Sequence, residues 1–284
     1  MFSLILENEN GDTLNFQQNT ALTVVEIQGL NPPTANINTS EVSLMDGGKY
    51  NSAKLNMRTL DIAFAIEYSA PYNRVQIYKV LKSKQWIRMY YQGDYRNVFI
   101  DGYIQSIDIT YFEKKQIVTV SILCPSPYFK NAQEIISELA NIIKAFHFPF
   151  ASTEAPQLLM GYIDTVANVS IPNTGDVSTG LTIELYAKNT LSNPKIYNYV
   201  TQEYIGVNFS MEAGDLITIT TAQGNKSITL LRNGVETNIF NSLMKGSDWL
   251  QLEAGGSTFV YELGTGNLTD LLVTFKHYNL YEGV

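Results

Sequence analysis

Cys124 carries the most reactive side chain in this sequence, and it is the only cysteine. A nucleophilic thiol needs a base within reach, yet the chain has just two histidines, His147 and His277. Cys124 ends an apolar run and is followed directly by Pro125, a place where a thiol behaves as a small hydrophobic group. We therefore predict a structural role for Cys124 and no catalytic role.

The other reactive side chains form no recognisable constellation. Neither histidine has a second histidine or a carboxylate at the spacing that a metal site requires. The segment Asp-Gly-Gly-Lys at 46–49 lacks the glycine spacing and the hydroxyl residue of a phosphate-binding loop, so it predicts a turn. Carboxylates are scattered along the chain and no pair can be nominated for acid–base chemistry. The sequence predicts no enzyme, metal site or cofactor.

Composition favours a folded protein that does not bind nucleic acid. Hydrophobic residues make up 45% of the 284 residues, and charged ones 16%. The formal net charge of -8 opposes binding to phosphates. The first residues carry no basic region, and no window is as apolar as a membrane span. A single cysteine cannot form an intrachain disulfide, which predicts synthesis in a reducing cytoplasm.

Hydrophobic spacing predicts a mainly β chain of two domains. Leu60, Ile62, Phe64 and Ile66 alternate as in a half-buried strand. Residues 71–82 change to helical spacing, with Tyr72, Val75, Tyr78 and Leu81 on one stripe. Further strands are predicted at 85–92, 96–112 and 115–123. The N-terminal domain, residues 1–147, is thus predicted to be mostly β with one embedded helix.

The second half changes character. Residues 131–148 have apolar residues at helical spacing, which predicts an amphipathic helix. Small residues and prolines at 148–165 predict a linker. Many short strands follow over 166–284, which is typical of a β-sandwich or jelly roll. Asn233-Gly234 predicts a tight hairpin turn between two of those strands.

Aromatic residues are the remaining candidates for function, because interfaces and sugar-stacking surfaces both use them. Five of them are predicted to form a subunit or partner interface: Trp86, Tyr90, Tyr95, Tyr128 and Phe129. Under a carbohydrate-binding alternative, Trp249 and Tyr261 of the C-terminal domain are the predicted sugar contacts. Most aromatic residues of a β protein belong to its core, and that reading stays open for each of them.

Several blocks of sequence resemble one protein family. They are residues 29–64 (GLNPPTANINTSEVSLMDGGKYNSAKLNMRTLDIAF), 78–129 (YKVLKSKQWIRMYYQGDYRNVFIDGYIQSIDITYFEKKQIVTVSILCPSPYF), 146–151 (FHFPFA), 171–187 (IPNTGDVSTGLTIELYA), 213–231 (AGDLITITTAQGNKSITLL), 247–256 (SDWLQLEAGG) and the ending YEGV. Together they are similar to the distal tail protein (Dit) family of long-tailed phages and prophages.

The resemblance implies a structural protein at the distal end of a virion tail, assembled in the host bacterial cytoplasm. It implies that the N-terminal domain is a β-sandwich with an embedded helix that forms a homohexameric ring, and that an outer, galectin-like C-terminal β-sandwich follows. The ring would join the major tail tube protein to the tail-associated spike or lysin, and receptor-binding or other baseplate proteins would attach outside. Viral DNA would pass through the ring without specific binding, and the acidic chain suggests a lumen that repels it.

Overall fold

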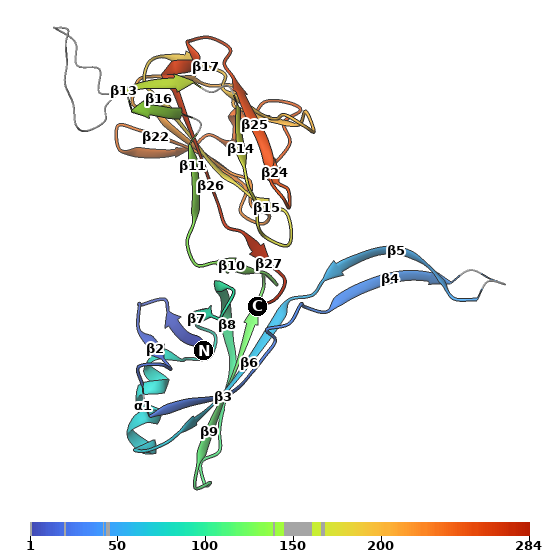
Figure 1. The fold of residues 1–284 in the computed structure, drawn as a ribbon, viewed down its shortest axis with the longest axis vertical. Coiled ribbons are helices and arrows are strands. Elements are labelled where there is room, and N and C mark those ends of the chain that lie inside the picture. The colour runs from blue at the N-terminus through green and yellow to red at the C-terminus, as the bar shows by residue number, and fades with distance from the viewer. Residues whose placement is uncertain are drawn as a thin grey trace. The chain divides into compact units, whose positions relative to one another are not determined.

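Strands dominate the computed structural model, which confirms the mainly β prediction (Figure 1). The structure describes residues 2–19, 21–41, 43, 46–138, 140–144, 161–165 and 168–284. The chain divides into two compact units: an N-terminal unit of residues 1–133 and 280–284, and a C-terminal unit of residues 134–279. Each unit has its own hydrophobic core.

The N-terminal unit is built around one continuous antiparallel sheet. Its elements are β1 (Ser3–Asn8), β2 (Thr13–Asn15), β3 (Leu22–Gln28), β4 (Ala35–Glu41), β5 (Gly48–Leu55), β6 (Arg58–Ile66), α1 (Ala70–Val80), β7 (Trp86–Gln92), β8 (Asn97–Ile109), β9 (Gln116–Cys124), β10 (Phe129–Asn131) and β27 (Leu280–Tyr281). The main path runs β2-β1-β7-β8-β9-β6-β3, and β10 and β27 extend it beside β8.

The two-residue alternation of β6 places its apolar side chains in the core of this unit. Leu60, Ile62 and Phe64 are fully buried. The sheet curves over this core, so that Phe16, just after β2, meets Phe64 edge to face at a ring distance of 4.9 Å. The layers of this unit are therefore formed by one sheet that folds over itself.

Helix α1 forms where the helical spacing predicts it, but it buries a different face. Pro71 occupies the first turn, where its missing N–H is tolerated. The buried residues of the helix are Asn73, Ile77 and Val80. Of the stripe noted in the sequence, Tyr72, Val75 and Tyr78 are exposed and Leu81 is buried. Ile77 and Val80 with Leu81 form an alternative apolar stripe, and the sheet packs against that one.

The C-terminal unit is a sandwich of two main sheets. Its elements are β11 (Ile135–Glu138), β12 (Ala140–Lys144), β13 (Gly161–Thr165), β14 (Asn168–Ile171), β15 (Thr179–Gly180), β16 (Thr182–Ala187), β17 (Leu191–Ser192), β18 (Lys195–Asn198), β19 (Tyr204–Gly206), β20 (Ser210–Met211), β21 (Leu216–Thr220), β22 (Ser227–Arg232), β23 (Val235–Asn238), η1 (Phe240–Ser242), β24 (Gln251–Leu252), β25 (Ser257–Glu262), η2 (Leu268–Asp270) and β26 (Leu271–His277).

One sheet has the order β11-β26-β16-β21-β22-β23 and the other β14-β25-β18-β19. They meet at Phe259 of β25 and Phe275 of β26, whose rings stack at 5.1 Å in the core. Asn233 and Gly234 both have positive φ, 52° and 77°, and they join β22 to β23 in the tight hairpin turn that their sequence predicts. A sandwich is therefore present, and its galectin-like character remains a prediction.

The boundary between the units differs from the predicted one. The helix predicted at 131–148 is wrong over its described part, because β11 pairs with β26 and β12 pairs with β13. β-Branched isoleucines at 135, 136, 142 and 143 suit strands as well as helices. The C-terminal unit therefore begins at Glu134 and not after residue 147. Of the predicted linker, 148–160 lie outside the described residues and 161–165 form β13.

The chain also crosses between the units a second time. After β26 it returns to the N-terminal unit, where Leu280 and Tyr281 form β27 beside β10. The backbone N–H of Val284 donates to the carbonyl of Leu30 at 3.2 Å. This C-terminal segment (280–284) therefore completes the N-terminal sheet, which places it outside the predicted domain 166–284.

Candidate assembly surfaces

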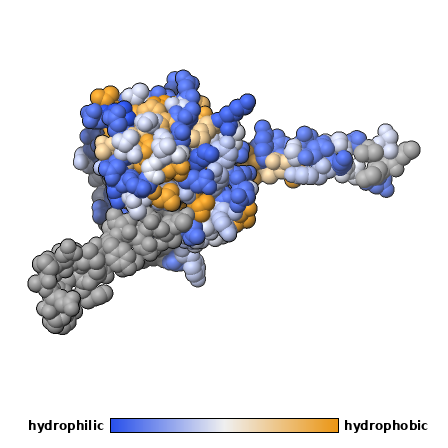
Figure 2. Space-filling view, turned by 90° about the horizontal axis from the view of Figure 1, so that it is seen from above, coloured by the Kyte–Doolittle hydropathy of each residue, from blue (hydrophilic) through white to orange (hydrophobic). Residues whose placement is uncertain are grey.

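The hairpin of β4 and β5 projects from the N-terminal unit, and we call it the arm (residues 35–55) (Figures 1 and 2). Every residue of its two strands is exposed except Leu55, which is half-buried. The Asp-Gly-Gly-Lys segment lies at its turn, where Gly47 has a φ of 86°. An isolated two-stranded hairpin is marginally stable in water. The arm is therefore a feature that another surface would stabilise.

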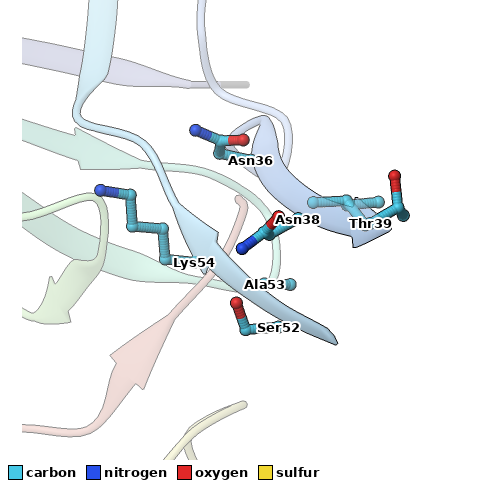
Figure 3. A pocket seen from close by; sticks show the side chains of 7 residues that line it. Asn36, Asn38, Thr39, Ser52, Ala53 and Lys54 are labelled. Carbon is cyan, nitrogen blue, oxygen red and sulfur yellow. The ribbon is translucent and has the colours of Figure 1, made fainter. Parts of the chain in front are cut away.

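The pairing register gives the arm one apolar face and one polar face. Ile37 lies opposite Ala53, and Tyr50 lies opposite Thr39 on the same face. Ile37 and Tyr50 are 59% and 61% exposed, so this apolar face is uncovered. The other face carries the amide, hydroxyl and amino groups of Asn36, Asn38, Ser52 and Lys54. A hollow beside the hairpin is lined from both faces, because Ile37 and Ala53 border it as well (Figure 3). The apolar face is the one that gains from a partner.

Two of the predicted interface residues, Trp86 and Tyr90, lie on one face of β7 with Arg88 between them. Cross-strand pairing places Arg88 opposite Asp101 of β8, and its Nε donates to Asp101 Oδ1 at 2.6 Å. The guanidinium also lies 4.3 Å from the ring centre of Phe99 and 5.3 Å from that of Trp86. Cation–π contacts and an ion pair thus order this half-exposed face.

Tyr95 and Tyr128 also remain available to a partner, whereas Phe129 does not. Tyr95 is fully exposed in the turn between β7 and β8, and Tyr128 is half-buried before β10. Phe129 is completely buried, because β10 turns it into the core of its own unit beneath Arg58. The prediction that Phe129 belongs to an interface is therefore wrong. Phe129 begins β10 directly after a proline-rich segment, and the local sequence does not indicate that a strand starts there.

Arg58, which was not among the predicted residues, holds four chain segments together. The residue is 3% exposed, and its guanidinium lies 4.5 Å from the centre of the Phe129 ring. Nε donates to the carbonyl of Pro127 at 2.7 Å, and Nη1 donates to that of Asn31 at 2.7 Å. Further bonds go to the carbonyls of Gly29 and Glu282. A charged residue at the start of a strand gives no hint of such partners in a sequence.

Cys124 has the environment predicted for it. It is fully buried at the end of β9, opposite Arg58 of β6. Burial raises the pKa of its thiol to about 12, so the reactive thiolate is scarce at neutral pH. A Cβ atom placed on Gly102 would lie 2.9 Å from its sulfur, so this corner of the core is filled.

The residues predicted to contact sugar are separated by the fold. Tyr261 is buried, and its hydroxyl donates to the carbonyl of Leu268 at 3.0 Å, so it belongs to the core and that prediction is wrong. Trp249 is half-exposed and stacks on Phe240 at 5.7 Å, with Lys226 Nζ 5.2 Å from its ring centre. Of the predicted pair, Trp249 alone retains an exposed edge.

Of the two histidines, only His277 lies within the described residues, and it is not at these surfaces. His277 is buried at the end of β26, and burial lowers the pKa of its imidazole. His147 lies outside the described residues. Within the described ranges, no group of three metal-ligating side chains is close enough to hold an ion. None of the described helices is both long and apolar enough to cross a membrane.

Charge is divided unevenly between the units. The N-terminal unit has 12 basic and 13 acidic residues, whereas the C-terminal unit has 7 and 14. The acidic excess therefore belongs to the C-terminal unit, and the suggestion of a lumen that repels DNA stays a prediction. The nearly neutral N-terminal unit supplies no net charge to repel DNA.

Comparison with known proteins defines the class. Residues 174–278 match the family described as "Siphovirus-type tail component, C-terminal domain". The Dit protein of phage SPP1, described as a paradigm of the hub adsorption apparatus in phages that infect Gram-positive bacteria, is 14% identical. The match covers 97% of this chain and 98% of that one, with a TM-score of 0.68.

A chain from the phage P2 baseplate, in its activated conformation with calcium, matches over the whole of both chains at 12% identity and a TM-score of 0.56. No curated protein sequence matches this chain. The resemblance noted from the sequence is thus confirmed. Residues 174–278 thus match the C-terminal domain of siphovirus-type tail components, and the fold of the chain is similar to that of the SPP1 Dit protein.

Proposed function

We propose that this protein is the hub of a siphophage tail, a structural protein that closes into a ring at the tail's distal end. The observation that carries the proposal is the arm, a long hairpin whose apolar face is uncovered in a single chain. The family match of the C-terminal domain and the shared fold support the same reading.

Copies of this chain are the natural partners of the arm. A projection on one part of a molecule that docks on a different part of the next copy makes a head-to-tail contact, and such contacts close into rings when the rotation permits. The face of β7 and β8 with Trp86, Arg88 and Tyr90 is a second surface available for contacts in the assembly. Six copies is the number that the family resemblance implies.

The remaining partners follow from the place of such a ring in a tail. We propose that one face meets the major tail tube protein, that the other meets the spike or lysin, and that receptor-binding or baseplate proteins attach outside. Viral DNA would pass through without specific binding. Because the N-terminal unit is nearly neutral, that passage would depend on the local arrangement of charges around the lumen.

Electron microscopy of tails from the producing phage or prophage tests this proposal. Gold-labelled antibody against the chain should mark one position, at the distal end of the tail tube. Particles from a strain that lacks this gene should have no baseplate, and supplying the gene in trans should restore it. Labelling elsewhere on the virion, or complete tails without the protein, would contradict the proposal.

Sugar binding by the C-terminal unit is the alternative that the sequence suggested. Its support is reduced to Trp249, one side of which already packs against Phe240. A glycan array tests it directly: saturable binding to the intact chain that Trp249→Ala abolishes would establish a carbohydrate-binding role. The tail location tested above does not depend on that outcome.

A further inference from the structure

Helix α1 presents an aromatic surface to solvent. Tyr72, Val75 and Tyr78 lie at intervals of three on its outer side and are 66%, 54% and 37% exposed. Tyr111 and Phe112, in the turn between β8 and β9, are exposed as well. The hydroxyls of Tyr78 and Tyr111 lie 2.6 Å apart, so the turn is joined to the helix. We call these five residues the α1 surface.

This surface is too apolar to be a simple solvated face. Single exposed apolar residues are ordinary, but clustered aromatic residues mark contact sites. Tyrosines in particular are enriched where protein interfaces concentrate their binding free energy. Arg74 lies 5.2 Å from the Tyr111 ring and donates to Gln116 Oε1 at 2.8 Å, which fixes the helix and the turn as one surface.

Basic residues surround the α1 surface. Residues 68–84 contain four basic residues and no acidic one, and residues 110–116 add two basic and one acidic. Lys79, Lys82 and Lys114 are exposed, whereas Lys115 pairs with Glu67 at 2.9 Å. An aromatic centre with a basic rim fits a partner that is apolar in the middle and acidic at its edges.

We propose that the α1 surface receives the arm of a second copy of this chain. The arm offers the matching chemistry, because its apolar face carries Ile37, Tyr50 and the acidic Glu41, and Asp46 lies in its turn. The two basic residues of the arm, Lys49 and Lys54, lie on its other face, so the acidic side chain belongs to the face that would dock. Both surfaces are uncovered in the single chain, so their contact buries apolar area on each side. This proposal rests on the ring proposed above and names the contact that closes it.

The arrangement of the two surfaces agrees with a head-to-tail contact. Within the N-terminal unit, α1 and the arm project on opposite sides of the sheet (Figure 1). An arm therefore cannot reach the α1 surface of its own chain, and the match is made between copies. Repetition of one heterologous contact leaves no free surface when the ring closes.

Cysteine cross-linking of the full-length chain tests the contact. Ser43→Cys places a thiol at the turn of the arm, and Val75→Cys places one on the α1 surface; both positions are exposed. Native Cys124 is buried and does not compete. Mixing the two variants under mild oxidation should give disulfide-linked dimers. Val200→Cys, exposed in the C-terminal unit, is the matched control and should form at least tenfold fewer with Ser43→Cys.

Charge reversal sharpens the test. Adding Glu41→Lys and Asp46→Lys to the arm variant should slow cross-linking to Val75→Cys about tenfold, because like charges then meet. Adding Lys79→Glu and Lys114→Glu to the acceptor should restore the rate. Restoration is the result that a merely misfolded variant cannot give, so it separates a specific contact from damage to the fold.

The outcomes distinguish this contact from the ring itself. Rings seen by electron microscopy without arm-to-α1 cross-links, or equal cross-linking to Val75→Cys and Val200→Cys, would overturn the contact and leave the ring standing. Absence of both rings and cross-links would overturn both. Duplex DNA binding that Lys79→Glu and Lys114→Glu weaken, with cross-linking unaffected by charge reversal, would assign the basic rim to nucleic acid and also overturn the contact.

Discussion

The two units of this chain are both built mainly of β-strands, but they differ in net charge and in the apolar surface that they leave exposed. The C-terminal unit closes two sheets over one core and carries seven more acidic than basic residues. The N-terminal unit is nearly neutral, yet it leaves an amphipathic arm and an aromatic helix face in solvent. The C-terminal unit covers its core within a single chain, whereas the N-terminal unit exposes apolar surfaces that a second copy of the chain can cover.

One arginine in each unit illustrates a further difference. In the C-terminal unit, Arg232 is partly exposed and pairs with the carboxylate of Asp215, whose side chain is 2% exposed. In the N-terminal unit, the buried Arg58 instead binds four backbone carbonyls from three segments, including the C-terminal one. Arg232 neutralises the carboxylate of Asp215, whereas Arg58 holds the ends of several loops in place.

Removing the arm should have the largest effect on assembly and a small effect on folding. We predict that replacing residues 35–55 by a short Asn-Gly turn abolishes ring formation while the free energy of unfolding of the N-terminal unit changes by less than about 1 kcal/mol, since an isolated hairpin contributes little stability. Sedimentation measures assembly, and urea unfolding measures stability. The paired variants Ile37→Ser/Tyr50→Ser and Asn36→Ser/Asn38→Ser should separate the two faces, with assembly weakened by the first alone.

Arg58→Met should have the largest effect on the stability of the N-terminal unit. It leaves several carbonyls without a donor, which we expect to cost at least about 3 kcal/mol. Because each unit contains one tryptophan, Trp86 or Trp249, a Trp249→Phe background reports the N-terminal unit alone by fluorescence. Hydrogen exchange should also rise at residues 280–284. Arg74→Met is the control, and a similar loss there would contradict a special role for Arg58.

Acid should weaken the C-terminal unit through Asp215. Its hydrogen bond to Arg232 lowers the pKa of the carboxyl below its usual value. A carboxylate with a lowered folded pKa stabilises the fold above the unfolded pKa of about 4 and loses that contribution as the pH falls further. Asp215→Asn should therefore cost about 2 kcal/mol at neutral pH and flatten the acid dependence below pH 4. An unchanged acid dependence would exclude Asp215 as its source.

The smallest predicted effect concerns Cys124. Since burial raises the pKa of its thiol to about 12, a thiol reagent at pH 8 should leave the native protein unlabelled and modify one thiol per chain after unfolding. Absorbance of the released chromophore measures the reaction. Rapid labelling of the native chain would show that this corner of the N-terminal core opens readily.

Patterns over a few adjacent residues correctly predicted the elements whose conformation is determined by those residues. The alternation at 60–66 gave a core strand, and Asn233-Gly234 gave a hairpin whose turn residues have the positive φ that asparagine and glycine tolerate. Helix α1 also formed where its spacing changes. In each case the pattern was read over a few adjacent residues, and tertiary contacts did not oppose it.

Predictions failed where distant partners decide the structure. Residues 135–138 have helical spacing, but β26, more than a hundred residues later, pairs with them as a strand. Helix α1 carries two apolar stripes, and the stripe with Ile77 and Val80 is the one that packs against the sheet. The return of the C-terminal segment to Arg58 and β10 has no local signature. The arm was visible in principle as alternation around Gly47-Gly48, although only its turn was predicted.

The most direct test of the account is the mass of the full-length chain in solution, measured by native mass spectrometry beside the chain without its arm. We predict that the intact chain, alone or with the tail tube protein added, forms a closed species of six copies, and that the armless chain stays monomeric under the same conditions. A six-copy species that forms equally well without residues 35–55 would contradict assembly through the arm. A strictly monomeric intact chain at every concentration and with the tube protein present would contradict the ring.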